Sequence, residues 1–275
     1  MPSEQSPSLP RITIITSTLN CAGALAATAQ SIRSQTYSNV QWIVADGGST
    51  DGTVERIRES TVSHWFSEAD SGIYDAWNKA CQFIDGEWVL FLGAGDLLME
   101  VDTLQKVGTR LAASEPEILV VYGNVIQGEP GTAGRRYGEV NLKGWDLFRP
   151  ALPAHQGVFA RSGLFSGPSP FDSSYRVAAD SKFLLQIIRG EVTRYVDVDI
   201  TRWVPGGISE HPKSTLRVMR ELLRLESDLG YRIPPVRRFA FVLRSYGRAI
   251  VYRLAGANAV ELAARAKRGI GRIFL

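Results

Sequence analysis

The chain has 275 residues, of which 44% are apolar and 21% are charged, and its formal net charge is +3. This length and composition predict one large globular domain, or one domain with an appendage. No run of about 18 uncharged apolar residues occurs, which argues against a membrane-spanning helix. The first ten residues, MPSEQSPSLP, are polar and proline-rich, so residues 1–10 are expected to form a flexible leader and not a signal peptide.

Charge is spread unevenly along the chain. Residues 211–275 contain 14 Lys and Arg against 4 Asp and Glu, so this segment carries +10 and the first 210 residues carry −7. We therefore expect two regions with different surroundings. The two cysteines, Cys21 and Cys81, are far apart and match no metal-ligand spacing, so we expect reduced thiols in a cytosolic protein.

Strand and helix patterns alternate along the first half of the chain. Apolar and β-branched runs predict strands, and segments of helix formers with an apolar stripe predict helices between them. The expected strands are 12–17, 40–45, 64–69, 87–92 and 117–125, and the expected helices are 22–35, one from Asp51 or Thr53 through Arg58, 72–84 and 102–112. This order is typical of an α/β fold with a mostly parallel central sheet covered by helices on both faces.

The pattern changes after residue 128. The segment GEPGTAGRRYGEV contains turn residues typical of a hairpin, and a helix at 178–190 and a strand at 193–204 are expected beyond it. A double proline, Pro234 and Pro235, predicts a boundary before a basic helical segment.

Polar residues stand at the carboxyl ends of the expected strands: Ser17 to Asn20, Asp46, Asp70 and Asp96. Open parallel sheets bind ligands beyond the carboxyl ends of their strands. We therefore expect these four groups to line one cleft, although turns favour aspartate in any case.

Four motifs occur in a fixed order: ITSTLN, DGGSTDGT, SEADSGIYDAWNKA and GEWVLFLGAGD. In this order and spacing they resemble family 2 glycosyltransferases of the GT-A fold, which is Rossmann-like, close to the branch that builds bacterial exopolysaccharide and lipopolysaccharide. The resemblance implies a nucleotide-sugar-binding half at 11–127, an acceptor-binding half at 128–210 and a C-terminal helical extension at 211–275. The implied partners are a nucleotide-diphosphate sugar, with a UDP-sugar slightly favoured, and a glycan or lipid-linked acceptor.

The resemblance also implies a set of donor-binding residues. Carried over position by position, they are Ser17, Leu19, Asn20, Asp46, Asp70, Asn78, Lys79, Gly93 and Gly95. Asp46 would contact the base or ribose, and a turn or cap aspartate is the alternative interpretation of this residue. One position departs from the common D-D-x-S motif, because Gly47 stands where relatives have a second acid that often contacts the base.

FLGAGD matches the family's metal motif, and this match implies a site for a divalent metal, Mg²⁺ or Mn²⁺. Glycines stand at two of the motif's acidic positions, so Asp96 is its one carboxylate. A helix N-cap is the alternative role for Asp96. His155, in an HQ pair of the branch, is a less certain metal ligand. The implied catalytic base is Asp180, near the start of the helix after the acceptor loop, and Asp172 is the second choice.

The segment 236–256 places apolar residues along one helical stripe with arginines beside it. This pattern is typical of an interfacial helix on anionic lipid, and packing against the catalytic domain is the alternative. No motif supports nucleic-acid binding. The resemblance, together with this helix pattern, thus implies an inverting glycosyltransferase of bacterial surface polysaccharide synthesis, cytoplasmic and peripheral at the inner face of the membrane. The alternative is a non-catalytic nucleotide-sugar-binding or scaffold subunit with the same fold.

Overall fold

The computed structural model describes residues 8–271 apart from 147, 189–191, 205, 208 and 210, with only the backbone described for 258 and 261–271. Residues 1–7 of the expected leader, and the last two residues of the helix expected at 178–190, lie outside the described residues. The chain divides into two units, Met1–Gly144 with Ala151–Pro205 and Trp145–Pro150 with Gly206–Leu275, and each is considered by itself.

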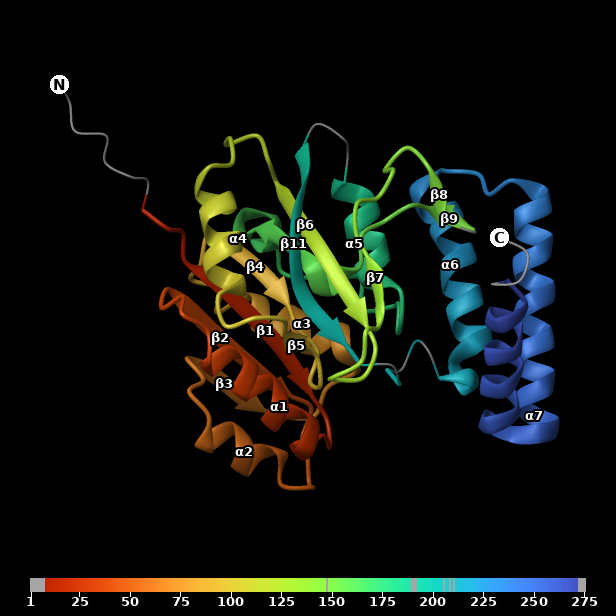
Figure 1. Cartoon of the computed structure of the whole chain (residues 1–275), viewed down its shortest axis with the longest axis horizontal. Helices are drawn as coiled ribbons and strands as arrows, with labels where there is room; N and C mark the ends of the chain where they lie inside the picture. The colour runs from red at the N-terminus through yellow and green to blue at the C-terminus, as the bar shows by residue number, and fades with distance from the viewer. Residues whose placement is uncertain are drawn as a thin grey trace. The chain divides into compact units, whose positions relative to one another are not determined.

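The described part of the first unit is built on a nine-stranded sheet (Figure 1). Its strand order is β3-β2-β1-β4-β10-β6-β11-β5, and β7 pairs with β6. The strands are β1 (Ile12–Thr18), β2 (Val40–Asp46), β3 (His64–Ser67), β4 (Trp88–Phe91), β5 (Leu97–Leu98), β6 (Val120–Gln127), β7 (Arg135–Tyr137), β10 (Val158–Arg161) and β11 (Thr193–Trp203). Strands β1 to β4 are parallel, β11 runs parallel to β6, and β10 lies antiparallel between β4 and β6.

The parallel strands end level with one another. Thr18 of β1 pairs with Asp46 of β2, and Asp46 pairs with Ser67 of β3. Both β1 and β2 are buried almost throughout, as expected for β-branched and apolar runs in the centre of a parallel sheet. The registers therefore bring the polar residues that follow these strands to one edge of the sheet.

Helices cover both faces of this sheet (Figure 1). They are α1 (Ala22–Arg33), α2 (Thr53–Glu59), α3 (Ile73–Cys81), α4 (Thr103–Ala112) and α5 (Ala179–Ile187), with short 3₁₀ helices η1 (His155–Gly157) and η2 (Ser162–Phe165). Right-handed crossovers put α1 and α2 on one face, and α3, which returns from β3 to β4, on the other. The expected α/β class, with a mostly parallel sheet and helices around it, is confirmed.

An aromatic cluster packs α3 against the second half of the unit. Trp77 lies 4.5 Å from Phe91 and 5.1 Å from Phe171 between ring centroids, and Phe171 lies 4.9 Å from Phe183 of α5. Trp77 is buried, as expected for a core residue. Phe83, two residues beyond the end of α3, is exposed and stacks on His64 with the ring centroids 3.8 Å apart.

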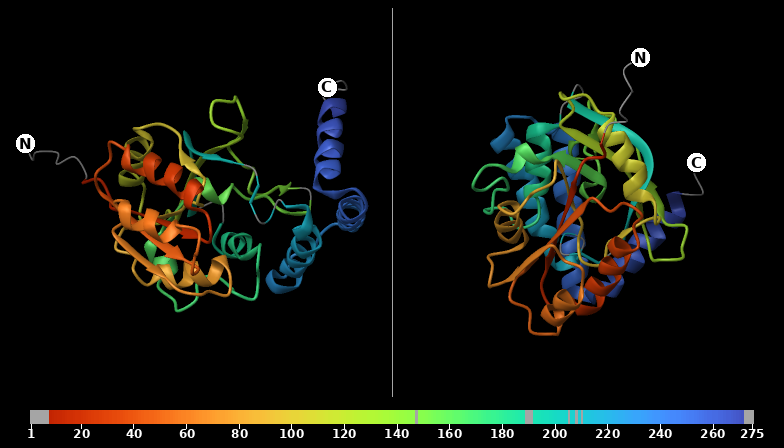
Figure 2. Two further views of the ribbon diagram at one scale, coloured as in Figure 1. Left: turned by 90° about the horizontal axis from the view of Figure 1, so that it is seen from below. Right: turned by 90° about the vertical axis from the view of Figure 1, so that its left-hand side faces the viewer.

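The second unit contains the hairpin β8 (Trp145–Asp146) and β9 (Arg149–Pro150), the 3₁₀ helix η4 (Pro212–Ser214), and the helices α6 (Thr215–Leu229) and α7 (Pro235–Gly271). Phe148 of the hairpin turn stacks on Phe241 of α7 with the ring centroids 3.5 Å apart. Gly256, at φ 76° and ψ −176°, breaks α7 into two parts that run in different directions (Figure 2). Among the described residues, no helix combines the length and apolar character needed to cross a membrane.

Replacement of Gly123 by Ala should destabilise the sheet. Gly123 lies in β6, and a Cβ there would lie 2.6 Å from the carbonyl oxygen of Val198 and 2.7 Å from Cδ1 of Ile200. Because both contacts belong to the neighbouring strand β11, we expect the free energy of unfolding to fall by about 1–3 kcal/mol in urea denaturation. Gly163→Ala is the control, since no atom lies within 4 Å of its new Cβ. Equal stability of the two variants would contradict the tight packing of β6 on β11.

Candidate active site

The carboxylate of Asp46 ties the ends of three strands together. Its Oδ1 accepts hydrogen bonds from the hydroxyls of Thr18 and Ser49, and its Oδ2 accepts from the backbone N–H groups of Gly48 and Ser49 and from the Ser67 hydroxyl. The residue is fully buried. Burial alone would raise the pKa of Asp46, but these hydrogen bonds outweigh it and hold the pKa below its ordinary value. Asp46 therefore fixes the loop that follows β2.

The end of β1 forms the neighbouring part of the cleft. Asn20 adopts the left-handed conformation with φ 49°, and its Oδ1 accepts a hydrogen bond of 2.9 Å from the backbone N–H of Thr50. Leu19 is 58% exposed, and the Ser17 hydroxyl accepts a hydrogen bond of 3.2 Å from Nε1 of Trp77. This edge thus offers an open apolar side chain beside two polar groups.

Asp70 begins the connection to α3. Its Oδ1 accepts a hydrogen bond of 2.8 Å from the backbone N–H of Gly72, whose φ of 129° turns the chain into the helix. Lys79, later on the same helix, places its ammonium 2.8 Å from Glu68 and 3.6 Å from Asp75. The ammonium of Lys79 is therefore already paired with the chain's own carboxylates.

Asn78 clamps the loop that precedes α5. Its Nδ2 donates to the backbone carbonyl of Phe171 at 2.8 Å, and its Oδ1 accepts from the N–H of the same residue at 2.9 Å. The side chain is buried. The amide of Asn78 thus joins the two halves of the unit, a role that the sequence did not indicate.

The stretch FLGAGD forms a closed turn after β4. Oδ2 of Asp96 accepts from the N–H of Gly93 at 3.2 Å, and the Thr28 hydroxyl donates to the Asp96 carbonyl at 2.9 Å while it accepts from the N–H of Gly95 at 2.8 Å. Gly95 has φ 101°, a conformation that favours glycine. Asp96 is buried, and the described residues contain no group of three or more His, Cys, Asp and Glu placed to hold a metal ion.

Three elements meet at Asp180, in the first turn of α5. The Tyr74 hydroxyl of α3 lies 2.9 Å from Oδ1 of Asp180, and Nδ1 of His155 lies 3.2 Å from Oδ2. The structure thus brings His155 and Asp180 together, and both carboxylate oxygens face a donor. The sequence did not indicate that Tyr74 contacts Asp180. It also did not indicate that Arg176 reaches the turn before α3, where its Nη1 lies 3.0 Å from the position that a Cβ on Gly72 would take.

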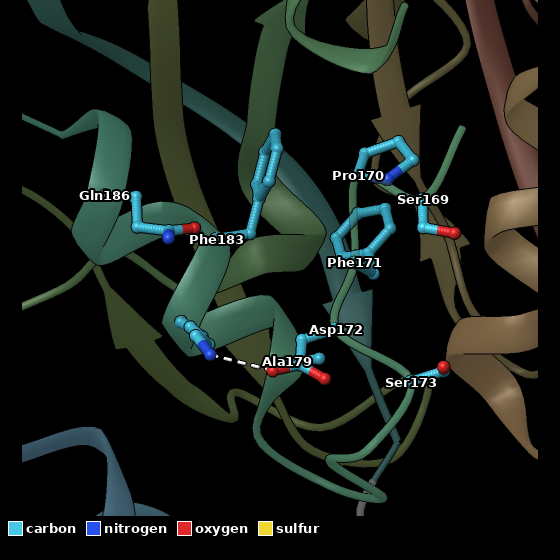
Figure 3. Close-up of a pocket in the computed structure, with 9 residues that line it drawn as sticks. Ser169, Pro170, Phe171, Asp172, Ser173, Ala179, Phe183 and Gln186 are labelled. Carbon is cyan, nitrogen blue, oxygen red and sulfur yellow. Dashed lines mark hydrogen bonds and ion pairs between the residues drawn. The ribbon is translucent and has the colours of Figure 1, made fainter. Parts of the chain in front are cut away.

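A pocket of about 370 Å³ lies between α5 and the loop before it (Figure 3). Lys182 and Asp172 form an ion pair of 2.7 Å at its wall. The lining residues are Ser169, Pro170, Phe171, Asp172, Ser173, Ala179, Lys182, Phe183 and Gln186. Burial alone would raise the pKa of Asp172, but hydrogen bonds from Lys182 and Ser174 outweigh it and lower the pKa to about 2. The carboxylate of Asp172, the second choice for a base, is thus paired with Lys182.

The ion pair should make stability depend on pH. Because the pKa of Asp172 falls from 3.8 to about 2 on folding, its contribution is fully present above pH 3.8 and disappears as the pH falls through about 2. We expect Asp172→Asn to lower the melting temperature at neutral pH, and the difference from the wild type to shrink as the pH falls below about 4. Glu117→Gln, at an exposed acid, is the control. A difference that stayed constant down to pH 2 would contradict this interpretation.

Comparison with known proteins identifies the family and the fold. The model of the family described as glycosyl transferase family 2 matches residues 13–184. A PGL/p-HBAD biosynthesis glycosyltransferase of Mycobacterium bovis is 36% identical over 259 residues, which cover 89% of this chain and 95% of the relative. Among solved structures, the mannosyltransferase PcManGT of Pyrobaculum calidifontis, in complex with GDP-Man and Mn²⁺, has a TM-score of 0.60 at 18% identity, covering 96% of this chain and 75% of its own.

TarS of S. aureus in complex with UDP has a TM-score of 0.57 at 15% identity and covers 92% of this chain and 75% of its own. These two likenesses confirm the expected GT-A fold. The match of the family model and the identity with the mycobacterial relative extend over most of the chain. The chain therefore belongs to glycosyl transferase family 2 and is a glycosyltransferase.

Proposed function

We propose that the protein is an inverting glycosyltransferase that moves a sugar from a nucleotide-diphosphate sugar to a glycan or lipid-linked acceptor in bacterial surface polysaccharide synthesis. The observation that carries this proposal is the environment of Asp180. A hydroxyl from α3 and a ring nitrogen from η1 face its two oxygens, so the carboxylate is held in one orientation at a helix N-terminus. The helix dipole favours the ionised form at that position, as a general base requires.

The proposed reaction is a single displacement. Asp180 accepts the proton of an acceptor hydroxyl while that oxygen forms a bond to the anomeric carbon of the donor sugar. The bond between this carbon and the nucleoside diphosphate breaks, and the nucleoside diphosphate leaves with the bonding electrons. Because the attack comes from the face opposite to the leaving group, the configuration at the anomeric carbon is inverted.

The donor would lie along the carboxyl ends of β1 to β4. The exposed Leu19, the left-handed Asn20 and the loop that Asp46 fixes support a nucleoside site there. TarS of S. aureus is described in complex with UDP and with UDP-GlcNAc, and PcManGT with GDP-Man. A UDP-sugar is the donor that we favour.

A divalent cation, Mg²⁺ or Mn²⁺, fits the turn at Asp96. The carboxylate is the oxygen ligand that a hard cation prefers, and one protein carboxylate is enough where phosphates and water fill the remaining positions. When bound, the cation would neutralise charge on the leaving diphosphate. Nδ1 of His155 faces Asp180, which leaves Nε2 as its second ring nitrogen for a metal. PcManGT is described with Mn²⁺.

The pocket beside α5 is the proposed acceptor site. Its lining combines the aromatic rings of Phe171 and Phe183 with hydroxyl, amide and charged groups. Ala179, Lys182, Phe183 and Gln186 of the lining belong to α5, the helix that also carries the proposed base Asp180. A relative from Escherichia coli, 32% identical over 88 residues that cover 31% of this chain and 35% of its own, is described as acting on a GlcNAc-diphosphoundecaprenol. A lipid-linked glycan is therefore the acceptor that we favour.

Residues 236–256 of α7 form the proposed membrane contact. Five large apolar side chains at helical spacing are each more than half exposed: Val236, Phe239, Leu243, Ile250 and Leu254. The opposite face, with Phe241, Ser245 and Ala249, is buried.

Charge supports the same contact. Residues 236–256 include five arginines and no acidic residue. Helical spacing places Arg237 and Arg244 on one side of the apolar stripe and Arg253 on the other. Such a face is complementary to a membrane that contains anionic lipid, and its location would be the inner face, where a lipid-linked acceptor is reached.

Substitution of Asp180 by Asn tests the base. We expect the rate of transfer to fall about 10²–10⁴-fold, because the amide cannot accept the proton. Binding of the nucleotide by calorimetry should persist. Asp85→Asn, at an exposed acid that pairs with Arg11 on the surface, is the matched control and should keep wild-type turnover. Near-normal turnover of Asp180→Asn would contradict the proposed role of Asp180 as the base.

A vesicle experiment tests the membrane contact. We expect the protein to sediment with vesicles of equal phosphatidylglycerol and phosphatidylcholine, more weakly at high salt, and less with phosphatidylcholine alone. Leu243→Glu with Ile250→Glu should reduce the bound fraction about 10-fold or more, because it removes apolar contact and adds negative charge. Val101→Glu, at an exposed valine of the first unit, is the control. Unchanged binding of the α7 variant would contradict the proposed face.

A further inference from the structure

Thr28 is a buried polar residue in the middle of α1. It shares the buried face of this helix with Leu25 and Ile32, and none of its side chain is exposed. A buried hydroxyl needs a hydrogen-bond partner. A threonine inside a helix often bonds to the carbonyl four residues before it, but the Ala24 carbonyl is 3.5 Å away, at the limit of a hydrogen bond. The helix itself therefore does not account for this hydroxyl.

The hydroxyl of Thr28 bonds instead to the FLGAGD turn after β4. It donates to the Asp96 carbonyl at 2.9 Å and accepts from the N–H of Gly95 at 2.8 Å. Its proton and one of its lone pairs are thus used on two adjacent residues of the turn. The turn contains two glycines, and Gly95 has φ 101°, so its backbone has little conformational preference of its own. Thr28 therefore supplies a restraint that the sequence of the turn lacks.

Two further polar side chains, in α1 and just after it, bond to the segment that follows the turn. Ser31 accepts a hydrogen bond of 3.2 Å from the N–H of Leu98, and Gln35 donates to the carbonyl of Glu100 at 2.8 Å. Of these three side chains, Thr28 is the one that bonds to the turn itself. A loss of the Ser31 contact can therefore be compared with a loss of the Thr28 contact.

We infer that Thr28 is a positioning residue for the cation of the donor site. Its hydroxyl fixes the backbone of Gly95 and Asp96, and with it the direction of the Asp96 carboxylate. The inference rests on the proposed donor and cation sites. Because FLGAGD keeps one carboxylate, no second acid of the motif can replace a misplaced one. Removal of a group that orients a metal ligand typically lowers metal affinity about 10–100-fold.

Calorimetry with UDP, with and without saturating Mn²⁺, tests this inference on the full chain. Cation and nucleotide raise each other's affinity, so the measured quantity is the factor by which Mn²⁺ tightens UDP binding. We expect this factor to be about 10 or more for the wild type. It should fall close to one for Thr28→Val, which keeps the branched shape of the side chain but lacks the hydroxyl. UDP affinity without Mn²⁺ should be the same in both proteins.

Two control variants separate the hydroxyl from the packing of the helix. Thr28→Ser keeps the hydroxyl and should retain most of the wild-type factor. Ser31→Ala removes a bond of the same kind to Leu98, beyond the turn, and should keep the wild-type factor even where its melting temperature falls. Should Thr28→Val fail to fold, Thr28→Ala removes the hydroxyl without a buried methyl group in its place.

The outcomes separate this inference from the proposed function. A wild type that does not bind UDP contradicts the proposed UDP-sugar donor and overturns the inference with it. Equal UDP affinity of the wild type with and without Mn²⁺ overturns the cation site and the inference, whereas the nucleotide site stands. Positioning by Thr28 is overturned, and both sites stand, if Thr28→Val keeps the wild-type factor or if Thr28→Ser or Ser31→Ala loses it.

Discussion

The buried carboxylate of Asp46 is the interaction on which the rest of the cleft depends. A charge without water is stable only where donors replace the solvent, and here hydroxyl and backbone groups from β1, the loop after β2 and β3 do so. Removal of any one of these donors would leave a buried charge less satisfied. The ends of three strands are therefore fixed together, and with them the loop to which Asn20 is bonded.

Two glycines in the strand-end loops have the same kind of neighbour. Neither Gly47 nor Gly93 has a positive φ, and a Cβ on Gly93 would lie 2.9 Å from Oδ2 of Asp96, much as one on Gly47 would meet Asp70. At Gly47 the carboxylate comes from Asp70 beyond the neighbouring strand, whereas at Gly93 it comes from Asp96, the one acid that the FLGAGD motif keeps. Only at position 47 does a carboxylate from another motif occupy the space of the missing acid.

Local patterns in the sequence predicted the parallel half of the sheet. Each of β1 to β4 is indicated by a short apolar or β-branched run, and each helix between them by an apolar stripe of helix formers. The four residues of β10 could not be placed, since their position between β4 and β6 depends on pairing across more than thirty residues. The site likewise combines features that local sequence patterns predict with features that depend on contacts between distant residues. The clustering at strand ends followed from the fold class, but the contact of Tyr74 with Asp180 joins residues 106 apart and leaves no local pattern.

Helix α3 joins the parts of the site that the sequence presented as separate. Asp70 bonds to the N–H of Gly72 just before the helix, Trp77 reaches Ser17 of β1, and Asn78 holds the backbone of Phe171 at the pocket beside α5. Tyr74 of the same helix faces Asp180. The contacts to the end of β1, to the loop before α5 and to the proposed base therefore come from three side chains of one nine-residue helix, Trp77, Asn78 and Tyr74.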